Sequence, residues 1–227
     1  MSLNQGIKKY GDRAIGGMTK ELRQMHMRKS FIPRHKHSLT AEEKKRMCRA
    51  VNQIKEKKSG EIKGRTCADG RFQRNYISKE DSASPTASTD AVILTAVMEA
   101  KEERRVITLD IPNAFIQTHV EDKEERIILI LEGLAVELLC QIEPAYIPYV
   151  TIERGQKVLY LECTNVIYGM LKAALLFYTS FKKRMEAVGF EINPYDRCTA
   201  NKIVNGKQMT IVWHVDDVEA STRRSRF

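Results

Sequence analysis

The feature that most restricts the fold lies near the C-terminal end, where Asn205-Gly206 precedes an apolar run that stops on Asp216-Asp217. An Asn-Gly pair readily adopts positive φ angles and joins two antiparallel strands in a tight hairpin. The second strand then ends on two adjacent carboxylates. Neighbouring side chains on a strand point to opposite faces, but a turn after the first acid can bring both toward one cation. The plainer interpretation of such a pair alone is a solvated turn, because Asp is a common turn residue.

A third carboxylate follows the same pattern. The short run at 106–109 is rich in β-branched residues, ends on Asp110, and is followed by Pro112, which limits the strand. If the two strands are neighbours in one sheet, Asp110 and the Asp216-Asp217 pair converge on hard cations, which prefer carboxylate oxygen. Two magnesium ions about 3.5–4 Å apart would then serve phosphoryl transfer.

Five segments, in order, resemble the reverse transcriptases of copia-type retrotransposons. They are IKGRTCADGRFQ at 62–73, SASPT at 82–86, LDIPNAF at 109–115, YGMLKAA at 168–174 and HVDD at 214–217. The resemblance covers residues 40–222. It implies the fingers and palm of a right-hand polymerase, an α+β fold with an antiparallel palm sheet.

The resemblance also implies roles for the acids. Asp110, Asp216 and Asp217 would be the catalytic carboxylates. Asp110 and Asp216 would be the principal ligands of two Mg²⁺ ions, which Mn²⁺ can replace, with the Ile111 carbonyl as an additional ligand and Asp217 as the secondary acid.

Further positions match parts of the family that contact the substrate. Lys63 and Arg65 would bind the triphosphate of the incoming deoxynucleotide, since Arg binds phosphate oxygens in pairs and Lys acts as a point charge. Phe115 would lie under the sugar and exclude a 2′-hydroxyl. Two positions depart from the family pattern: Lys172 stands where a Gln is usual, and His214 where a Tyr is usual. Lys172 would still reach the nucleotide, and His214 would stack beside the primer end.

The charge distribution favours a nucleic-acid partner. Residues 1–76 hold 20 Lys and Arg against 7 Asp and Glu, whereas the remaining residues hold 18 against 22. A basic region of this kind follows a phosphate backbone through salt-sensitive, sequence-independent attraction. The expected partners are an RNA or DNA template, a DNA primer and deoxynucleoside triphosphates. A solvated basic surface remains the alternative.

No apolar run is long enough to span a membrane, and no apolar leader opens the chain. The cysteines show no metal-ligand spacing and are expected to be free thiols in a reducing, intracellular setting, either a cytoplasmic particle or the nucleus. They are Cys48, Cys67, Cys140, Cys163 and Cys198.

Local patterns predict a basic N-terminal arm with a helix (1–39), partial fingers and palm (40–222) and a short basic tail (223–227). Helices are expected at 19–29, 40–50, 88–102, 112–118, 134–142 and 171–188. Strands are expected at 106–110, 126–132 and 157–164, with hairpins turning at Ser59-Gly60 and Asn205-Gly206.

Ten residues follow Asp217, and the resemblance implies that a thumb and an RNase H domain would lie beyond them in the remaining Pol segments. The chain is therefore expected to contain fingers and palm without thumb or RNase H. Two other classes of function stay open: a weak or inactive retroelement remnant that retains nucleic-acid binding, and an unrelated two-metal nuclease.

Overall fold

The computed structural model describes residues 1–123 and 126–223, so the expected basic tail lies outside the described residues apart from Arg223. The chain forms two compact units. The first unit comprises Met1–Lys79 and Phe115–Ala173, and the second comprises Glu80–Ala114 and Ala174–Phe227.

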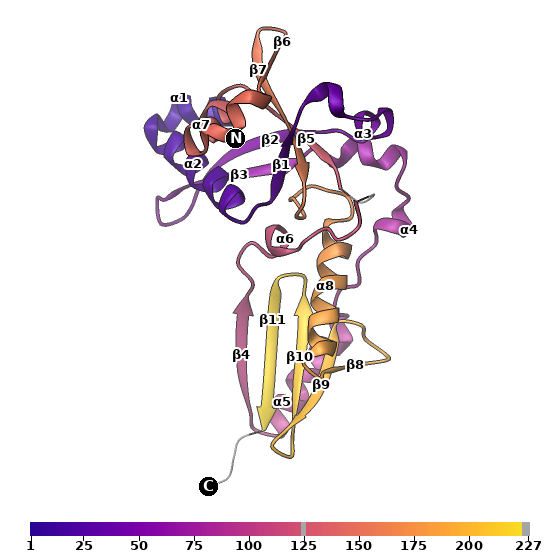
Figure 1. The fold of residues 1–227 in the computed structure, drawn as a ribbon. Helices are drawn as coiled ribbons and strands as arrows, with labels where there is room; N and C mark the ends of the chain where they lie inside the picture. Colours follow the sequence, from indigo (N-terminus) through magenta and orange to yellow (C-terminus); the bar gives the residue numbers. More distant parts are fainter. Residues whose placement is uncertain (124–125, 224–227) are drawn as a thin grey trace. The chain divides into compact units, whose positions relative to one another are not determined.

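The first unit is built on a six-stranded mixed sheet in the order β1-β7-β5-β2-β3, with β6 paired to β7 (Figure 1). The strands are β1 (Phe31–Arg34), β2 (Cys48–Glu56), β3 (Ile62–Ala68), β5 (Ile128–Glu132), β6 (Thr151–Glu153) and β7 (Gln156–Cys163). The helices are α1 (Leu3–Tyr10), α2 (Asp12–Met27), α3 (Ala41–Lys45), α6 (Ala114–Gln117) and α7 (Leu134–Ile142), with 3-10 turns η1 (Lys36–Ser38), η2 (Gly70–Asn75) and η4 (Pro144–Tyr149). The β2–β5 pair is parallel and the other pairs are antiparallel.

Residues 1–39, expected as a basic arm, pack into the first unit. Met18, Leu22 and Met25 of α2 are at most 1% exposed. The backbones of α2 and the β2–β3 hairpin touch, since a Cβ on Gly64 would lie 2.7 Å from the Gly17 carbonyl oxygen. Glycine is needed there for this close approach.

The second unit is a five-stranded antiparallel sheet in the order β4-β11-β10-β9-β8. Its strands are β4 (Arg104–Asp110), β8 (Glu191–Ile192), β9 (Thr199–Val204), β10 (Lys207–His214) and β11 (Asp217–Arg223). Its helices are α4 (Lys79–Ser82), α5 (Thr89–Lys101) and α8 (Ala173–Ala187).

The two faces of this sheet carry different helices. On one face, Trp213 and Val218 form a core against Tyr178 and Phe181 of α8. Side chains on the opposite face include Thr199 and Thr210, which share a cavity with α5 residues. Because side chains alternate along strands, this second face also carries Asp217 and Asp110.

The sequence patterns are confirmed for many elements and corrected for others. The α+β class is confirmed, as are the hairpins at Gly60 and at Asn205-Gly206 and the helices near 88–102, 134–142 and 171–188. The helix expected at 40–50 has its capping box at Thr40 but ends at Lys45, because Cys48 begins β2 and pairs with Leu129 of β5. The helix expected at 19–29 begins earlier, at Asp12.

Two other expectations concern the cysteines and membrane-spanning helices. All five cysteines are free thiols. Among residues 1–123 and 126–223, no helix combines the length and the apolar character that crossing a membrane requires.

Candidate active site

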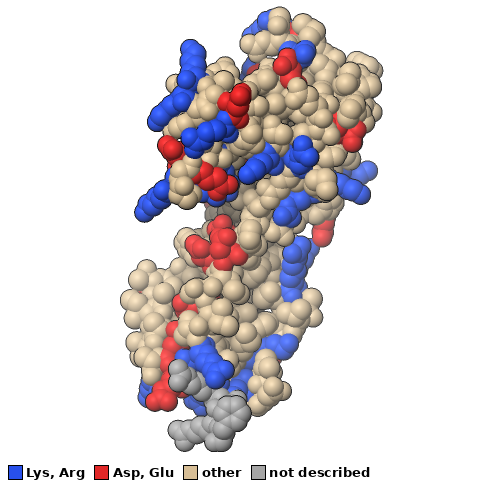
Figure 2. All heavy atoms as spheres, turned by 90° about the vertical axis from the view of Figure 1, so that its left-hand side faces the viewer, with Lys and Arg blue, Asp and Glu red and all other residues tan. Residues whose placement is uncertain are grey.

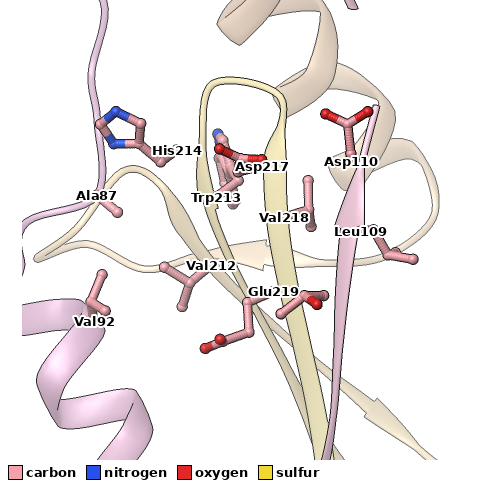
Figure 3. A pocket seen from close by; sticks show the side chains of 11 residues that line it. Ala87, Val92, Leu109, Asp110, Val212, Trp213, His214, Asp217, Val218 and Glu219 are labelled. Atoms are coloured by element: carbon pink, nitrogen blue, oxygen red, sulfur yellow. The ribbon is translucent and has the colours of Figure 1, made fainter. Parts of the chain in front are cut away.

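The strands that carry the three acids are neighbours in one sheet. β11 pairs with β4 so that Asp217 lies directly opposite Asp110. The Ile111 N–H donates to the Asp216 carbonyl at 2.9 Å, which makes Ile111 and Asp216 a hydrogen-bonded pair and Asp110 and Asp217 the adjacent non-hydrogen-bonded pair. In such a pair the Cα atoms are about 4.5 Å apart and the side chains approach closely. Figure 3 shows both carboxylates at the same end of the two strands.

Asp216 lies in the turn rather than beside the other two acids. The two-residue loop Val215-Asp216 connects β10 to β11, with His214 opposite Asp217. Val215 has a φ of 58°, and a positive φ at the first loop residue alone is the type II′ pattern, which normally carries Gly. The resemblance implies Asp110 and Asp216 as the principal metal ligands, and the strand register, which describes backbone pairing alone, places Asp217 opposite Asp110.

The acids open onto a cavity of about 520 Å³ within the second unit. Asp110, Asp217 and Glu219 line it together with His214, which is exposed, and Val92 of α5 (Figure 3). Burial and the nearby Glu99 raise the pKa of the Glu219 carboxyl above its ordinary value. A carboxylate-lined cavity of this kind attracts cations and disfavours a dense cluster of negative charge without them.

One energetic cost lies beside this cavity. A β-branched residue at positive φ, as at Val215, costs about 1–3 kcal/mol. Costs of this kind concentrate where function requires a geometry that folding alone does not favour. The Trp213 indole, 2% exposed, packs on the opposite face of the sheet against Tyr178 and Phe181.

The donor set fits Mg²⁺ in chemistry, since Asp110 and Asp217 offer adjacent carboxylate oxygens and Mg²⁺ prefers hard oxygen ligands. Among the described residues, no three His, Cys, Asp or Glu side chains stand close enough together to hold a metal ion as they lie. Asp216 directly precedes Asp217, and Ile111 directly follows Asp110, so both lie next to the opposed pair. A complete ligand set therefore requires the Asp216 side chain to turn toward Asp110.

A second group of predicted residues lies in the first unit. Lys63 and Arg65 are on the exposed face of β3, whose alternate residues are buried. The Arg65 guanidinium lies 4.6 Å from the centre of the Tyr168 ring, and the Phe115 ring lies 4.9 Å from the same ring. Tyr168 therefore brings Arg65 and Phe115 together.

Tyr168 was not predicted as a site residue, although a signal for its position existed in the sequence. Its carbonyl accepts from the Ala68 N–H at 2.7 Å, and Gly169, at a φ of 90°, lies against Ala68. A Cβ on Gly169 would be 2.1 Å from the Ala68 oxygen. The Tyr-Gly pair is thus a tight docking point on the end of β3, which a search for obligatory glycines would have marked.

Lys172 lines a different and smaller cavity of the first unit, of about 190 Å³. Arg46, Arg126 and the buried Gln73 line it as well. The Gln73 side-chain oxygen accepts from the Leu171 N–H at 2.6 Å, which fixes the loop that carries Lys172. Lys172 therefore shares this cavity with two other cations, Arg46 and Arg126.

Comparisons with known proteins give no family. No protein-family model matches the chain, and no curated protein matches it.

Proposed function

We propose that the chain contains the fingers and palm of a copia-type reverse transcriptase, an RNA-directed DNA polymerase. The observation that carries this proposal is the direct opposition of Asp110 and Asp217, with Asp216 in the connecting turn. Five sequence segments in the order typical of that family support it, including the two that carry these acids.

In the proposed reaction, the primer 3′-oxygen attacks the α-phosphate of a deoxynucleoside triphosphate. The new P–O bond forms as the bond to pyrophosphate breaks, and the hydroxyl proton leaves to solvent. Bound magnesium would lower the pKa of the attacking hydroxyl and neutralise charge on the leaving group. Asp110, Asp216 and Asp217 would hold it, with the Ile111 carbonyl as a further oxygen donor.

The other residues would bind and orient the substrates. Lys63 and Arg65 would bind the triphosphate, and Phe115, held against Tyr168, would lie under the sugar. Lys172 would contact the nucleotide, and His214, exposed beside Asp217, would stack on the primer end.

A primer-extension assay on an RNA template with Mg²⁺ or Mn²⁺ tests the proposal. Asp110→Asn and Asp217→Asn should each lower extension by about 100-fold or more, because a lost metal ligand removes several kcal/mol of charge stabilisation. Asp90→Asn, an exposed acid on α5, is the matched control and should leave extension unchanged. Extension that survives both site substitutions would refute the assignment.

A nucleic-acid-binding protein without catalysis is the second candidate. The excess of Lys and Arg in residues 1–76 favours it. Figure 2 shows Lys and Arg side chains scattered over the visible face of the first unit, with acidic side chains among them. Salt-sensitive binding without extension, unaffected by Asp110→Asn, would support this candidate. Cleavage of the template in place of extension would indicate a two-metal nuclease.

A further inference from the structure

β4 forms an open edge of the second sheet. In the part of the chain that the structure describes, β11 is its one partner strand, and Figure 1 shows β4 at the outer side of the sheet. Three apolar side chains on it are exposed: Ile107 by 60%, Leu109 by 54% and Val106 by 43%. An apolar edge strand of this length is a template for pairing with another chain.

The register shows which backbone groups of β4 are open. Because Ile111 and Asp216 form a hydrogen-bonded pair, odd-numbered residues of β4 face β11 with their N–H and C=O groups. The N–H and C=O groups of Val106 and Thr108 therefore point away from β11. They offer four hydrogen-bonding groups along the open edge.

The charges of β4 are complementary to those of a second, antiparallel copy. The strand begins with Arg104 and Arg105, ends with Asp110 and is uncharged between them. Antiparallel pairing places the basic start of each strand beside the acidic end of the other. β4 contains no Pro and no charged residue between Arg105 and Asp110. Pro and internal charges are features that prevent edge strands from pairing with another chain.

Helix α5 extends the same surface. It packs on β4 and β11, and Leu94 lies on the flank that shares a cavity with Thr199 and Asn201 of β9. On its other flank and outer side, Val92 is 46% and Ile93 57% exposed.

We propose that two copies of this chain associate through antiparallel pairing of β4 about a twofold axis at Ile107. Val106 of each copy exchanges backbone hydrogen bonds with the partner's Thr108. Ile107 then faces the partner's Ile107 in a continuous ten-stranded sheet, twice the five strands of one unit. The contact is isologous, as in most homodimers.

Disulfide trapping tests the register. In Ile107→Cys the two thiols face each other in a non-hydrogen-bonded pair, with Cα atoms about 4.5 Å apart, within the range of a disulfide. Diamide, which accepts the two electrons and two protons released, should cross-link this variant of the full chain. Val106→Cys and the parent chain should give little product. Equal cross-linking of Val106→Cys, or none of Ile107→Cys, would overturn the proposed register.

Sedimentation velocity over a concentration series tests the association itself. Thr108→Pro removes one outward N–H per copy and is compatible with an edge strand, so it should raise the dimer Kd about tenfold or more, through two lost hydrogen bonds. Thr108→Ala keeps the N–H and is the matched control, expected to stay within about threefold of the parent. A parent chain that is monomeric up to about 100 µM, or equal dimerisation of the two variants, would overturn the proposal.

Discussion

The second sheet contains two hairpins that share β10 and differ sharply in their turns. The β9–β10 turn is Asn205-Gly206, with φ angles of 49° and 71°, and these are the residues that tolerate such angles best. The β10–β11 turn is Val215-Asp216, in which Val215 has a φ of 58°. The residues of the β9–β10 turn favour their φ angles, whereas Val215 in the β10–β11 turn disfavours its φ angle.

The two turns also differ in their position relative to the opposed acids. The relaxed turn lies at the end of the sheet away from Asp110 and Asp217, since β10 runs between the two turns. The strained turn adjoins the opposed acids and the cavity. The Asn205-Gly206 turn therefore forms because its own residues favour the required angles. The Val215-Asp216 turn, which adjoins the opposed acids, is held in place by the neighbouring strands.

Placing the residues of the β10–β11 turn in the β9–β10 turn should produce the largest change in the free energy of unfolding. Replacing Asn205-Gly206 by Val-Asp, through Asn205→Val with Gly206→Asp, puts Val, which resists positive φ, and Asp, which adopts it less readily than Gly, into a turn that requires it at both positions. The free energy of unfolding should fall by about 2–4 kcal/mol, measured by urea denaturation. An unchanged urea midpoint would contradict the assignment of this turn.

Relieving the strained turn should have a smaller and opposite effect. Val215→Gly removes the Cβ that opposes a φ of 58° and should raise stability by about 1 kcal/mol, or Tm by about 2–4 °C. Asn205→Gly is the control, and it should change stability by less than about 0.5 kcal/mol because Asn already tolerates its angle. Equal effects of the two substitutions, measured by thermal unfolding, would remove the distinction between the turns.

The smallest effect concerns pH and involves the β10–β11 hairpin. The pKa of Glu219 is raised by burial and by Glu99. Its protonated form is therefore favoured by folding, so this contribution to stability is complete below the ordinary value of 4.5 and is lost as pH rises through the raised pKa.

Glu219→Gln should remove that part of the pH dependence, so that the variant gains Tm relative to the parent more at pH 7 than at pH 4. Glu191→Gln, at an exposed acid on β8, should show no such difference. A Glu219→Gln gain in Tm that is the same at both pH values would refute the linkage.

Elements marked by local chemistry could be predicted from the sequence. The Asn205-Gly206 hairpin and the starts of the helices expected from residues 40 and 88 appear where expected, with Thr40 and Ser88 as the N-caps, because each depends on a few adjacent residues. The capping box from Ser2 to Gln5 was available in the same way and begins α1. Its omission left α1 unpredicted.

Features set by distant partners could not be predicted in the same way. Cys48 begins a strand because it pairs with Leu129, which overrides the helical pattern that precedes it. The acids themselves were visible in the sequence, yet the choice of Asp217 over Asp216 as the partner of Asp110 depends on register. A shift of one residue would exchange the two acids between faces of the sheet.

The tight docking of Gly169 on Ala68 has a mechanical consequence. The Ala68–Tyr168 hydrogen bond ties the aromatic ring shared by Arg65 and Phe115 to the base of the β2–β3 hairpin. The tip of that hairpin is Gly60, far along β3 from Ala68. The hairpin is also held along its length, because Gly17 of α2 lies against Gly64 and the Arg13 guanidinium donates to the Gly60 carbonyl at 2.6 Å. Arg65, which lies between these contacts and Ala68, is therefore held in place relative to Phe115.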